Sequence, residues 1–185
     1  TRIAVLYNMK RDEKRSSKRS VRADSKPSGL VLIISGRFRG RKLPVLDVQG
    51  LRPTTDKNKE MLFSWLMPYT SDAKCLDAFA GSGSLGFEAL SRYAKSCTFI
   101  ELDRNVAKNL VANIELLGLS AQQAKIIQGD TLDTLNKLNN EEQSYELIFL
   151  DHHFNQNLLP QTISIIIDKS LLSQNAIDYI KYEVQ

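Results

Sequence analysis

The pattern of hydrophobic and polar positions divides the chain into three stretches. Residues 8–28 are rich in Lys, Arg and Ser and hold almost no large apolar side chains, so they cannot bury enough surface to offset the entropy of ordering. Residues 30–45 carry two short β-rich runs separated by Gly36 and Gly40, which predicts a hairpin. From Lys74 onward, apolar runs of strand length alternate with helical periodicity. The pattern therefore predicts a flexible basic arm over residues 1–28, a hairpin over 29–49 and one folded domain over 50–185.

Apolar runs predict five strands, with helices between them. The clearest helix spans residues 104–117, where apolar residues recur at helical spacing and Gly118 is placed to end it. Ahead of the first strand, Thr54 or Thr55 can cap a helix that Pro68 ends. This alternation predicts an α/β fold, with a mainly parallel sheet and helices on both faces. The expected strands are residues 75–80, 97–102, 124–128, 145–150 and 176–184, and two further helices are expected at 132–138 and 158–167.

A glycine-rich loop follows the first of these strands. Gly81, Gly83 and Gly86 form the pattern G-x-G-x-x-G at the start of a helix, where a tight turn and unpaired N–H groups can receive a polar ligand. Glu101 ends the next strand, 20 residues after Gly81, which is the distance at which a carboxylate reaches ribose hydroxyls. Glycines alone would also suit a plain tight turn. Together with the strand, the helix and Glu101, they favour binding of a nucleotide-type ligand.

Two cofactors fit this loop: a dinucleotide such as NAD, or S-adenosylmethionine. Asp77 lies four residues before Gly81, where it would repel a pyrophosphate but could accept a hydrogen bond from a cationic amino-acid group. That favours S-adenosylmethionine. Asp130 ends the third strand and is placed to accept from an adenine amino group; it could equally be the N-cap of the next helix, and the two roles are compatible.

Composition adds a strong asymmetry of charge. The 185 residues carry a net charge of +4, but residues 1–42 hold 13 Lys or Arg against 3 Asp or Glu, net +10, and the remainder holds 12 against 18, net −6. Such a basic front favours a polyanionic partner, and charge alone leaves RNA, DNA and an anionic membrane open. No apolar run approaches the roughly 18 residues of a membrane span. Cys75 and Cys97 lie within apolar runs, which suits reduced thiols in a cytoplasmic protein.

Several motifs in sequence order resemble the class I S-adenosylmethionine-dependent methyltransferases, and more narrowly the RsmD family of bacterial 16S ribosomal RNA guanine-N2 methyltransferases. They are ISGRFRGRKLPV, GLRPTTDKNKEMLFSWL and CLDAFAGSGSLGFEALSRY, followed by FIELDRN, LIFLD and a final I-x-Y-x-K-Y-E pattern, so the resemblance covers nearly all of residues 30–184. It implies a Rossmann-like fold and methyl transfer from S-adenosylmethionine to N2 of a guanine in 16S rRNA of the small subunit. We expect a cytoplasmic monomer with no resident metal and no membrane partner.

The resemblance also implies roles for individual residues. Arg52 and Thr54 match a segment that folds over the cofactor, and the basic residues of the hairpin would face RNA. The expected RNA-binding residues are Arg37, Arg39, Arg41 and Lys42, and the expected cofactor-binding residues are Arg52, Thr54, Asp77, Phe79, Ala80, Gly81, Ser82, Gly83, Glu101, Leu102, Asp130 and Thr131.

One motif departs from the family. The family carries Asp-Pro-Pro-Phe after the fourth strand, where this chain reads Asp151-His152-His153-Phe154. In amino methyltransferases this loop holds the target base, so these four residues are the expected catalytic set. Prolines would keep the loop in one shape. The histidines permit three interpretations: a working loop, a weakened enzyme that acts as an RNA-binding or assembly factor, or a metal site, the last disfavoured because no other ligands accompany them. An NAD-dependent oxidoreductase remains a further alternative.

Overall fold

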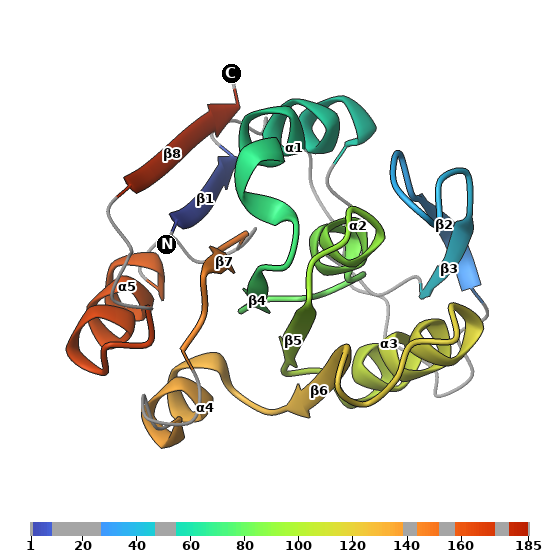
Figure 1. Cartoon of the computed structure of the whole chain (residues 1–185). Coiled ribbons are helices and arrows are strands. Elements are labelled where there is room, and N and C mark those ends of the chain that lie inside the picture. Colours follow the sequence, from blue (N-terminus) through green and yellow to red (C-terminus); the bar gives the residue numbers. More distant parts are fainter. Residues whose placement is uncertain are drawn as a thin grey trace, which may run out of the picture.

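A six-stranded parallel sheet forms the centre of the protein (Figure 1). The computed structural model describes residues 2–8, 27–46, 55–138, 144–151, 158–172 and 178–184. The strands lie in the order β6-β5-β4-β7-β1-β8, and each neighbouring pair is parallel. The elements are β1 (Arg2–Asn8), β2 (Pro27–Leu32), β3 (Lys42–Leu46), α1 (Asp56–Thr70), β4 (Lys74–Asp77), α2 (Ser84–Ser91), β5 (Ser96–Glu101), α3 (Arg104–Leu116), β6 (Ala124–Gln128), α4 (Thr131–Lys137), β7 (Leu147–Phe149), α5 (Leu158–Asp168) and β8 (Asp178–Val184).

The two faces of the sheet carry different helices. Alternate strand residues point to opposite faces. On one face, Cys75, Phe99 and Phe149 share a core with α1, α2 and α3. On the other, Leu76 and Ile148 share a second core with α4 and α5. The predicted α/β fold with helices on both faces is therefore confirmed. Within the described ranges, no helix is long and apolar enough to cross a membrane.

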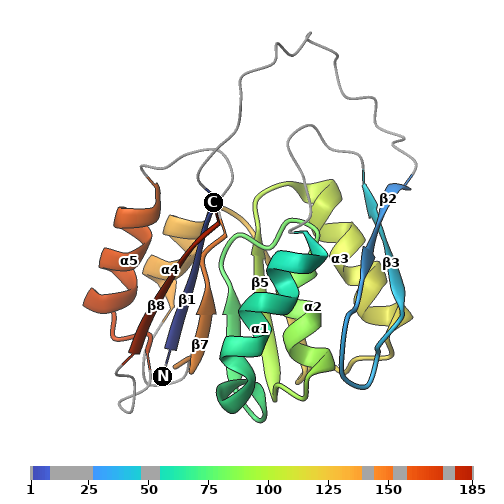
Figure 2. The ribbon, with the colours of Figure 1, turned by 90° about the horizontal axis from the view of Figure 1, so that it is seen from above.

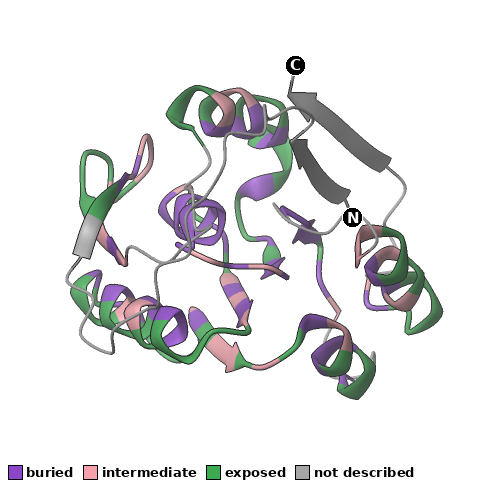
Figure 3. Cartoon of the chain, turned by 180° about the vertical axis from the view of Figure 1, so that it is seen from behind, coloured by how far each residue is buried: buried purple, intermediate pink, exposed green. Residues whose placement is uncertain are grey.

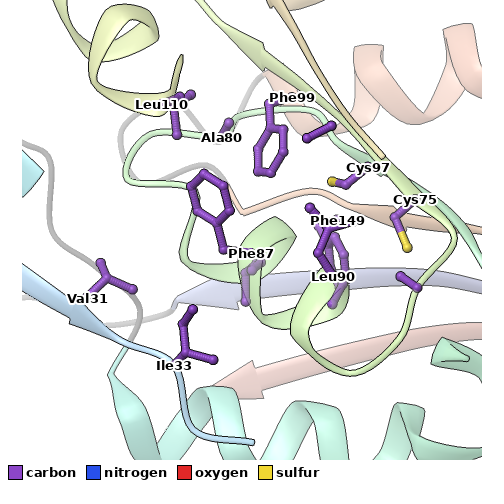
Figure 4. Close-up of a cluster of buried hydrophobic side chains, with 14 of the residues drawn as sticks. Val31, Ile33, Cys75, Ala80, Phe87, Leu90, Cys97, Phe99, Leu110 and Phe149 are labelled. Carbon is purple, nitrogen blue, oxygen red and sulfur yellow. The ribbon is translucent and has the colours of Figure 1, made fainter. Parts of the chain in front are cut away.

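Helix α2 is buried on all sides. Each of its residues is buried, and Figure 3 shows it in purple between the hairpin and the sheet. Phe87 packs against Phe99 of the sheet, with ring centroids 4.9 Å apart, while Val31 and Ile33 of the β2–β3 hairpin belong to the same core (Figure 4). The antiparallel hairpin thus forms a third layer that covers α2.

Local sequence signals account for most element ends. Thr55 caps α1, its hydroxyl accepting from the Asn58 N–H at 3.3 Å. Helix α3 ends as predicted before Gly118, whose φ of 65° is left-handed. The prediction that Pro68 ends α1 is wrong, because the helix continues to Thr70. Proline keeps a helical φ and removes one N–H donor, and the carbonyl left without it belongs to the exposed Ser64.

The amino-terminal segment differs from the expected arm. Residues 2–8 form strand β1, which lies between β7 and β8, so the sheet includes part of the stretch predicted to be flexible. The apolar run from Ile3 to Leu6 is the local cause, since a strand inside a parallel sheet is covered on both faces. Strand β2 also begins at Pro27, two residues earlier than the predicted hairpin. The rest of the predicted arm, residues 9–26, lies outside the described residues.

Candidate functional site

The candidate site lies where β4, β5, β6 and β7 end, which we call the carboxyl edge of the sheet. Neighbouring strands β4 and β7 connect to helices on opposite faces, α2 and α5 respectively. In parallel α/β sheets, ligands bind at this kind of switch point, in the crevice outside the carboxyl ends of the strands. The loops that follow these four strands carry most of the residues singled out in the sequence.

The glycine loop begins immediately after β4. The Ala80 N–H donates to the Ile100 carbonyl at 2.9 Å, and the Gly83 N–H donates back to the Ala80 carbonyl at 2.8 Å. Gly83 is the N-cap of α2 with φ 75°, and a Cβ there would lie 2.6 Å from the Phe87 ring and 2.7 Å from Leu110. Only glycine both adopts this left-handed φ without strain and avoids the clash that a Cβ would make. The sequence prediction of a tight strand-to-helix turn is confirmed.

Glu101 joins the glycine loop to the next strand. Its Oε2 accepts from the Gly81 N–H at 2.7 Å and its Oε1 accepts from the Asp103 N–H at 2.9 Å. Gly81 and Glu101, which are 20 positions apart in the sequence, are therefore in direct contact. Leu102 follows and is 65% exposed, an apolar side chain beside a carboxylate at the edge of the site. This pair offers one polar and one apolar surface to a ligand.

Asp77 is the most deeply placed carboxyl group of the site. It is 1% exposed, and its Oδ2 accepts from the Gly86 N–H in the first turn of α2 at 3.1 Å. Burial raises the pKa of Asp77 to about 7, against the opposing effect of the Gly86 hydrogen bond, and the carboxylates of Asp151 and Glu101 raise it further. The structure therefore brings together three acidic groups that lie far apart in the sequence.

Asp130 and Thr131 connect the third strand to the same edge. Asp130 is the N-cap of α4, since its Oδ1 accepts from the Asp133 N–H at 3.0 Å. Thr131 is buried, and its hydroxyl donates to the Ala78 carbonyl beside the glycine loop at 2.6 Å. The capping interpretation of Asp130 is confirmed, and the side chain remains exposed at the edge where a ligand would lie.

The remaining loop residues vary in how far the structure describes them. Phe79 is half-buried, while Ala80 and Ser82 are buried. Asp151, 9% exposed, follows β7 two residues after Phe149, the register partner of Asp77. The other expected residues, Arg52, Thr54, His152, His153 and Phe154, lie outside the described residues. In the described part of the chain, no group of His, Cys, Asp and Glu side chains is arranged to hold a metal ion.

The basic turn of the hairpin lies away from these loops. The Arg37 N–H donates to the carbonyl of Ser91 at the end of α2, and Arg41 Nη2 donates to the carbonyl of Leu116 at the end of α3. Both helices end where the strands begin, which we call the amino edge. Figure 2 shows the turn at the lower end of the hairpin, at the end of the molecule where β1 begins. The exposed side chains of Arg37, Arg39, Arg41 and Lys42 are therefore not part of the carboxyl-edge site.

A buried ionic cluster holds the hairpin against α1 and α2, and sequence reasoning missed it. Glu88 is 0% exposed and accepts from the N–H groups of Ile34 and Ser35 at 3.0 and 3.1 Å and from Arg92 Nε at 2.9 Å. Lys59, also 0% exposed, lies 3.5 Å from Glu88 and donates to the Leu32 carbonyl at 2.6 Å. Burial lowers the pKa of Lys59, an effect that Glu88 opposes. The available signal was one acidic residue within a helix of otherwise small or apolar residues.

Comparison with known proteins assigns the chain to a family. The family described as "Conserved hypothetical protein 95" matches residues 31–185. "Ribosomal RNA small subunit methyltransferase D" of Haemophilus influenzae is 51% identical over 155 residues, covering 84% of this chain and 80% of that protein. The Escherichia coli protein of the same name is 45% identical over 158 residues, covering 85% and 77% respectively. A solved structure of a putative Escherichia coli methyltransferase superimposes with a TM-score of 0.70 at 42% identity, covering 78% of this chain and 76% of that one. The chain therefore belongs to the RsmD family of class I methyltransferases.

Proposed function

We propose that the protein transfers a methyl group from S-adenosylmethionine to the exocyclic N2 of a guanine in 16S ribosomal RNA of the small subunit. The observation that carries this proposal is the contact between Glu101 and the glycine loop beside the buried Asp77. The names of the relatives support an rRNA substrate and methyl transfer as the reaction.

The residues present at the carboxyl edge fit S-adenosylmethionine better than a dinucleotide. Asp77, Glu101 and Asp151 make the site acidic, which favours a cationic ligand and opposes a pyrophosphate. Asp77 would hold the ammonium group of the cofactor, and Glu101 would accept from its ribose hydroxyls. The exposed Leu102 would pack on the adenine ring, and Asp130 would accept from the adenine amino group. Arg52 and Thr54 are proposed to close over the cofactor.

The cofactor, when bound, supplies an electrophilic methyl group on a sulfonium centre. The protein must make guanine N2 nucleophilic, because the lone pair of this amine is delocalised into the purine ring. Asp151, which is buried just after β7, would accept an N2–H hydrogen bond, and the buried position of its carboxylate would strengthen that bond. It would also receive the departing proton. The His152 carbonyl would accept the second N2–H, and Phe154 would stack on the base.

RNA would be held by basic residues outside this site. We assign phosphate contacts to the hairpin turn, in particular Arg37, Arg39, Arg41 and Lys42, and to the basic stretch that precedes the hairpin. Such contacts fix the position of the RNA without reading its sequence, and their contribution falls as salt rises.

The direct test is methyl transfer from labelled S-adenosylmethionine to small ribosomal subunits that lack the modification. We expect label in 16S rRNA at guanine N2. Asp151→Ala should abolish transfer while cofactor affinity, measured by calorimetry, stays within a few fold. Asp168→Ala, at the exposed end of α5 on the amino edge, is the matched control and should retain activity. A fully active Asp151→Ala enzyme would refute the assignment of the target loop.

The histidine pair gives a second test of the same loop. Replacing His152 and His153 together by proline should preserve or raise the transfer rate, because proline restricts the backbone to fewer shapes. Cofactor binding without any transfer by the unmodified protein would instead identify an RNA-binding or assembly factor.

A further inference from the structure

Tyr93 occupies a backbone position that favours glycine. Its φ is 69°, in the left-handed region. The Tyr93 N–H donates to the Leu90 carbonyl at 3.2 Å, and the Ala94 N–H donates to the Ala89 carbonyl at 3.0 Å. These two bonds form the Schellman motif that ends α2, in which the left-handed residue is usually glycine. A bulky aromatic residue is strained there.

Burial does not offset this strain. The Tyr93 side chain is 60% exposed, and among the described residues its hydroxyl makes no hydrogen bond. The conformation is held by its neighbours, since the Tyr93 carbonyl accepts from the Asp72 N–H at 2.9 Å. Strained residues that persist without a packing reason are enriched at functional sites. Tyr93 therefore combines a fixed backbone with an exposed aromatic ring, which makes it a candidate binding residue at this edge of the sheet.

Its surroundings are mostly basic. Along the amino edge, the Arg37 N–H donates to the Ser91 carbonyl and the Lys95 N–H donates to the Ala73 carbonyl. Tyr93 lies between Ser91 and Lys95 in the chain. Lys74 and Lys95 are exposed at the starts of β4 and β5. Four exposed carboxylates, those of Asp72, Glu115, Glu146 and Asp168, lie on the same edge. They are outnumbered by the exposed basic side chains, and we define the amino-edge patch as Arg37, Arg39, Lys74, Tyr93 and Lys95.

We propose that the amino-edge patch binds a single-stranded segment of the RNA substrate, with one unpaired base stacked on Tyr93 and the flanking phosphates on Lys74, Lys95 and Arg37. An aromatic ring among cations is the arrangement by which proteins bind single-stranded nucleic acid, because bases of any sequence stack and phosphates attract the cations. The proposal rests on the proposed function for the identity of the RNA. It adds a contact surface at the opposite edge of the sheet from Asp77, Glu101 and Asp151.

Tyr93→Gly is the decisive variant, because the proposal predicts opposite effects on stability and on binding. Removal of the strain should raise Tm by about 2–4 °C. Affinity of the full-length protein for a fluorescein-labelled oligouridine RNA, measured by anisotropy, should fall by about fivefold or more, the effect of losing one stacked base. Tyr93→Phe keeps the ring and should retain the affinity. Unchanged affinity in Tyr93→Gly, or a lower Tm, would overturn the proposal.

The salt dependence of RNA affinity tests the charged part of the patch. Lys95→Ala should lower the slope of log affinity against log salt by about 0.7, the value for one phosphate contact on a single strand. Lys137→Ala, an exposed lysine in the last turn of α4 on the other face of the sheet, should leave the slope unchanged. Equal slopes for Lys95→Ala and the unmodified protein would overturn the phosphate assignment. It would also be overturned if Lys95→Ala lost binding to phosphatidylglycerol vesicles but bound oligouridine as the unmodified protein does.

Failure of this proposal is separable from failure of the proposed function. The Tyr93 and Lys95 variants should bind S-adenosylmethionine normally and transfer methyl groups at an unchanged rate once RNA is saturating, with only the KM for RNA raised. A reduced rate at saturating RNA would contradict a binding role. If the unmodified protein transferred no methyl group, the proposed function would fall, whereas the oligouridine measurements would still decide the role of Tyr93.

Discussion

The carboxylate of Glu88 provides a strong test of how the hairpin is held. Replacing Glu88 by glutamine keeps the size of the side chain and removes its charge. The carboxylate accepts from two backbone N–H groups of the hairpin and from Arg92, and it lies 3.5 Å from the Lys59 ammonium. The amide has one acceptor oxygen in place of two. Its NH₂ group would face a donor, leaving a buried N–H without an acceptor and the buried Lys59 ammonium without a countercharge, with only the neutral Leu32 carbonyl and Ser84 hydroxyl as acceptors.

The expected loss of stability is large. Removing one partner of a buried ion pair costs about 3–5 kcal/mol, because the other charge stays buried. The total stability of a domain is about 5–15 kcal/mol, so this loss is a large fraction of it. Lys59→Met should cost a similar amount. The Lys59→Met, Glu88→Gln double variant should lose less than the sum of the two single variants by at least about 0.5 kcal/mol, since the two groups contact each other.

Urea unfolding followed by circular dichroism measures the global effect. Limited digestion with trypsin measures the local one, since the arginines of the Arg37–Arg41 turn are already exposed and detachment would free the backbone of the turn for cleavage. Glu115→Gln is the matched control, because this glutamate is exposed near the end of α3. A loss below about 1 kcal/mol in Glu88→Gln, with unchanged trypsin sensitivity, would show that the buried cluster does not hold the hairpin.

Three further variants test the site and its support. Burial raises the pKa of Asp77 to about 7, so the folded protein without cofactor should lose stability as pH rises from about 4 to 7. Cofactor affinity should rise over the upper part of that range, where the Asp77 carboxylate forms. Asp77→Asn should remove the pH dependence of stability, measured by urea unfolding, and that of cofactor affinity, measured by calorimetry. Glu101→Gln should weaken cofactor binding at least about tenfold by calorimetry, because it removes a charged acceptor, and an unchanged affinity would contradict the ribose assignment. Gly86→Ala should destabilise the protein by about 1–3 kcal/mol, since a Cβ would lie 2.2 Å from the Phe99 ring, whereas Gly129→Ala, with its nearest contact at 3.4 Å, should change the unfolding midpoint little.

Features determined by short stretches of sequence were predicted well. The glycine loop, the hairpin, the Thr55 cap of α1 and the stop of α3 depend on residues within a few positions of one another. The closeness of Glu101 to the glycine loop was also predictable, because a strand–turn–helix–strand unit has a nearly constant length, although its hydrogen bond to the Gly81 N–H was not foreseen. For the same reason, the carboxyl-edge grouping of Asp77 with Glu101 followed once the strands were assigned.

Features that depend on long-range packing were not predicted. A glutamate in mid-helix is usually on the surface, and the burial of Glu88 results from a hairpin more than 50 positions earlier in the chain. The placement of Arg37 at the amino edge depends on which end of α2 the turn reaches, and no local pattern encodes that. Strand β1 likewise acquires its partners β7 and β8 from the far end of the sequence.

The burial of α2 beneath the hairpin also constrains the order in which the protein can fold during synthesis. The hairpin is made first, yet the bonds that hold it, from Ser35 to Glu88 and from Ser91 to Ser35, span 53 and 56 positions. At about 5–20 residues per second, the ribosome needs roughly 3–10 s to supply that length. A two-stranded hairpin is marginally stable alone. For those seconds the apolar side chains of β2 and β3 have no cover, so the nascent chain is most prone to aggregation before α2 emerges.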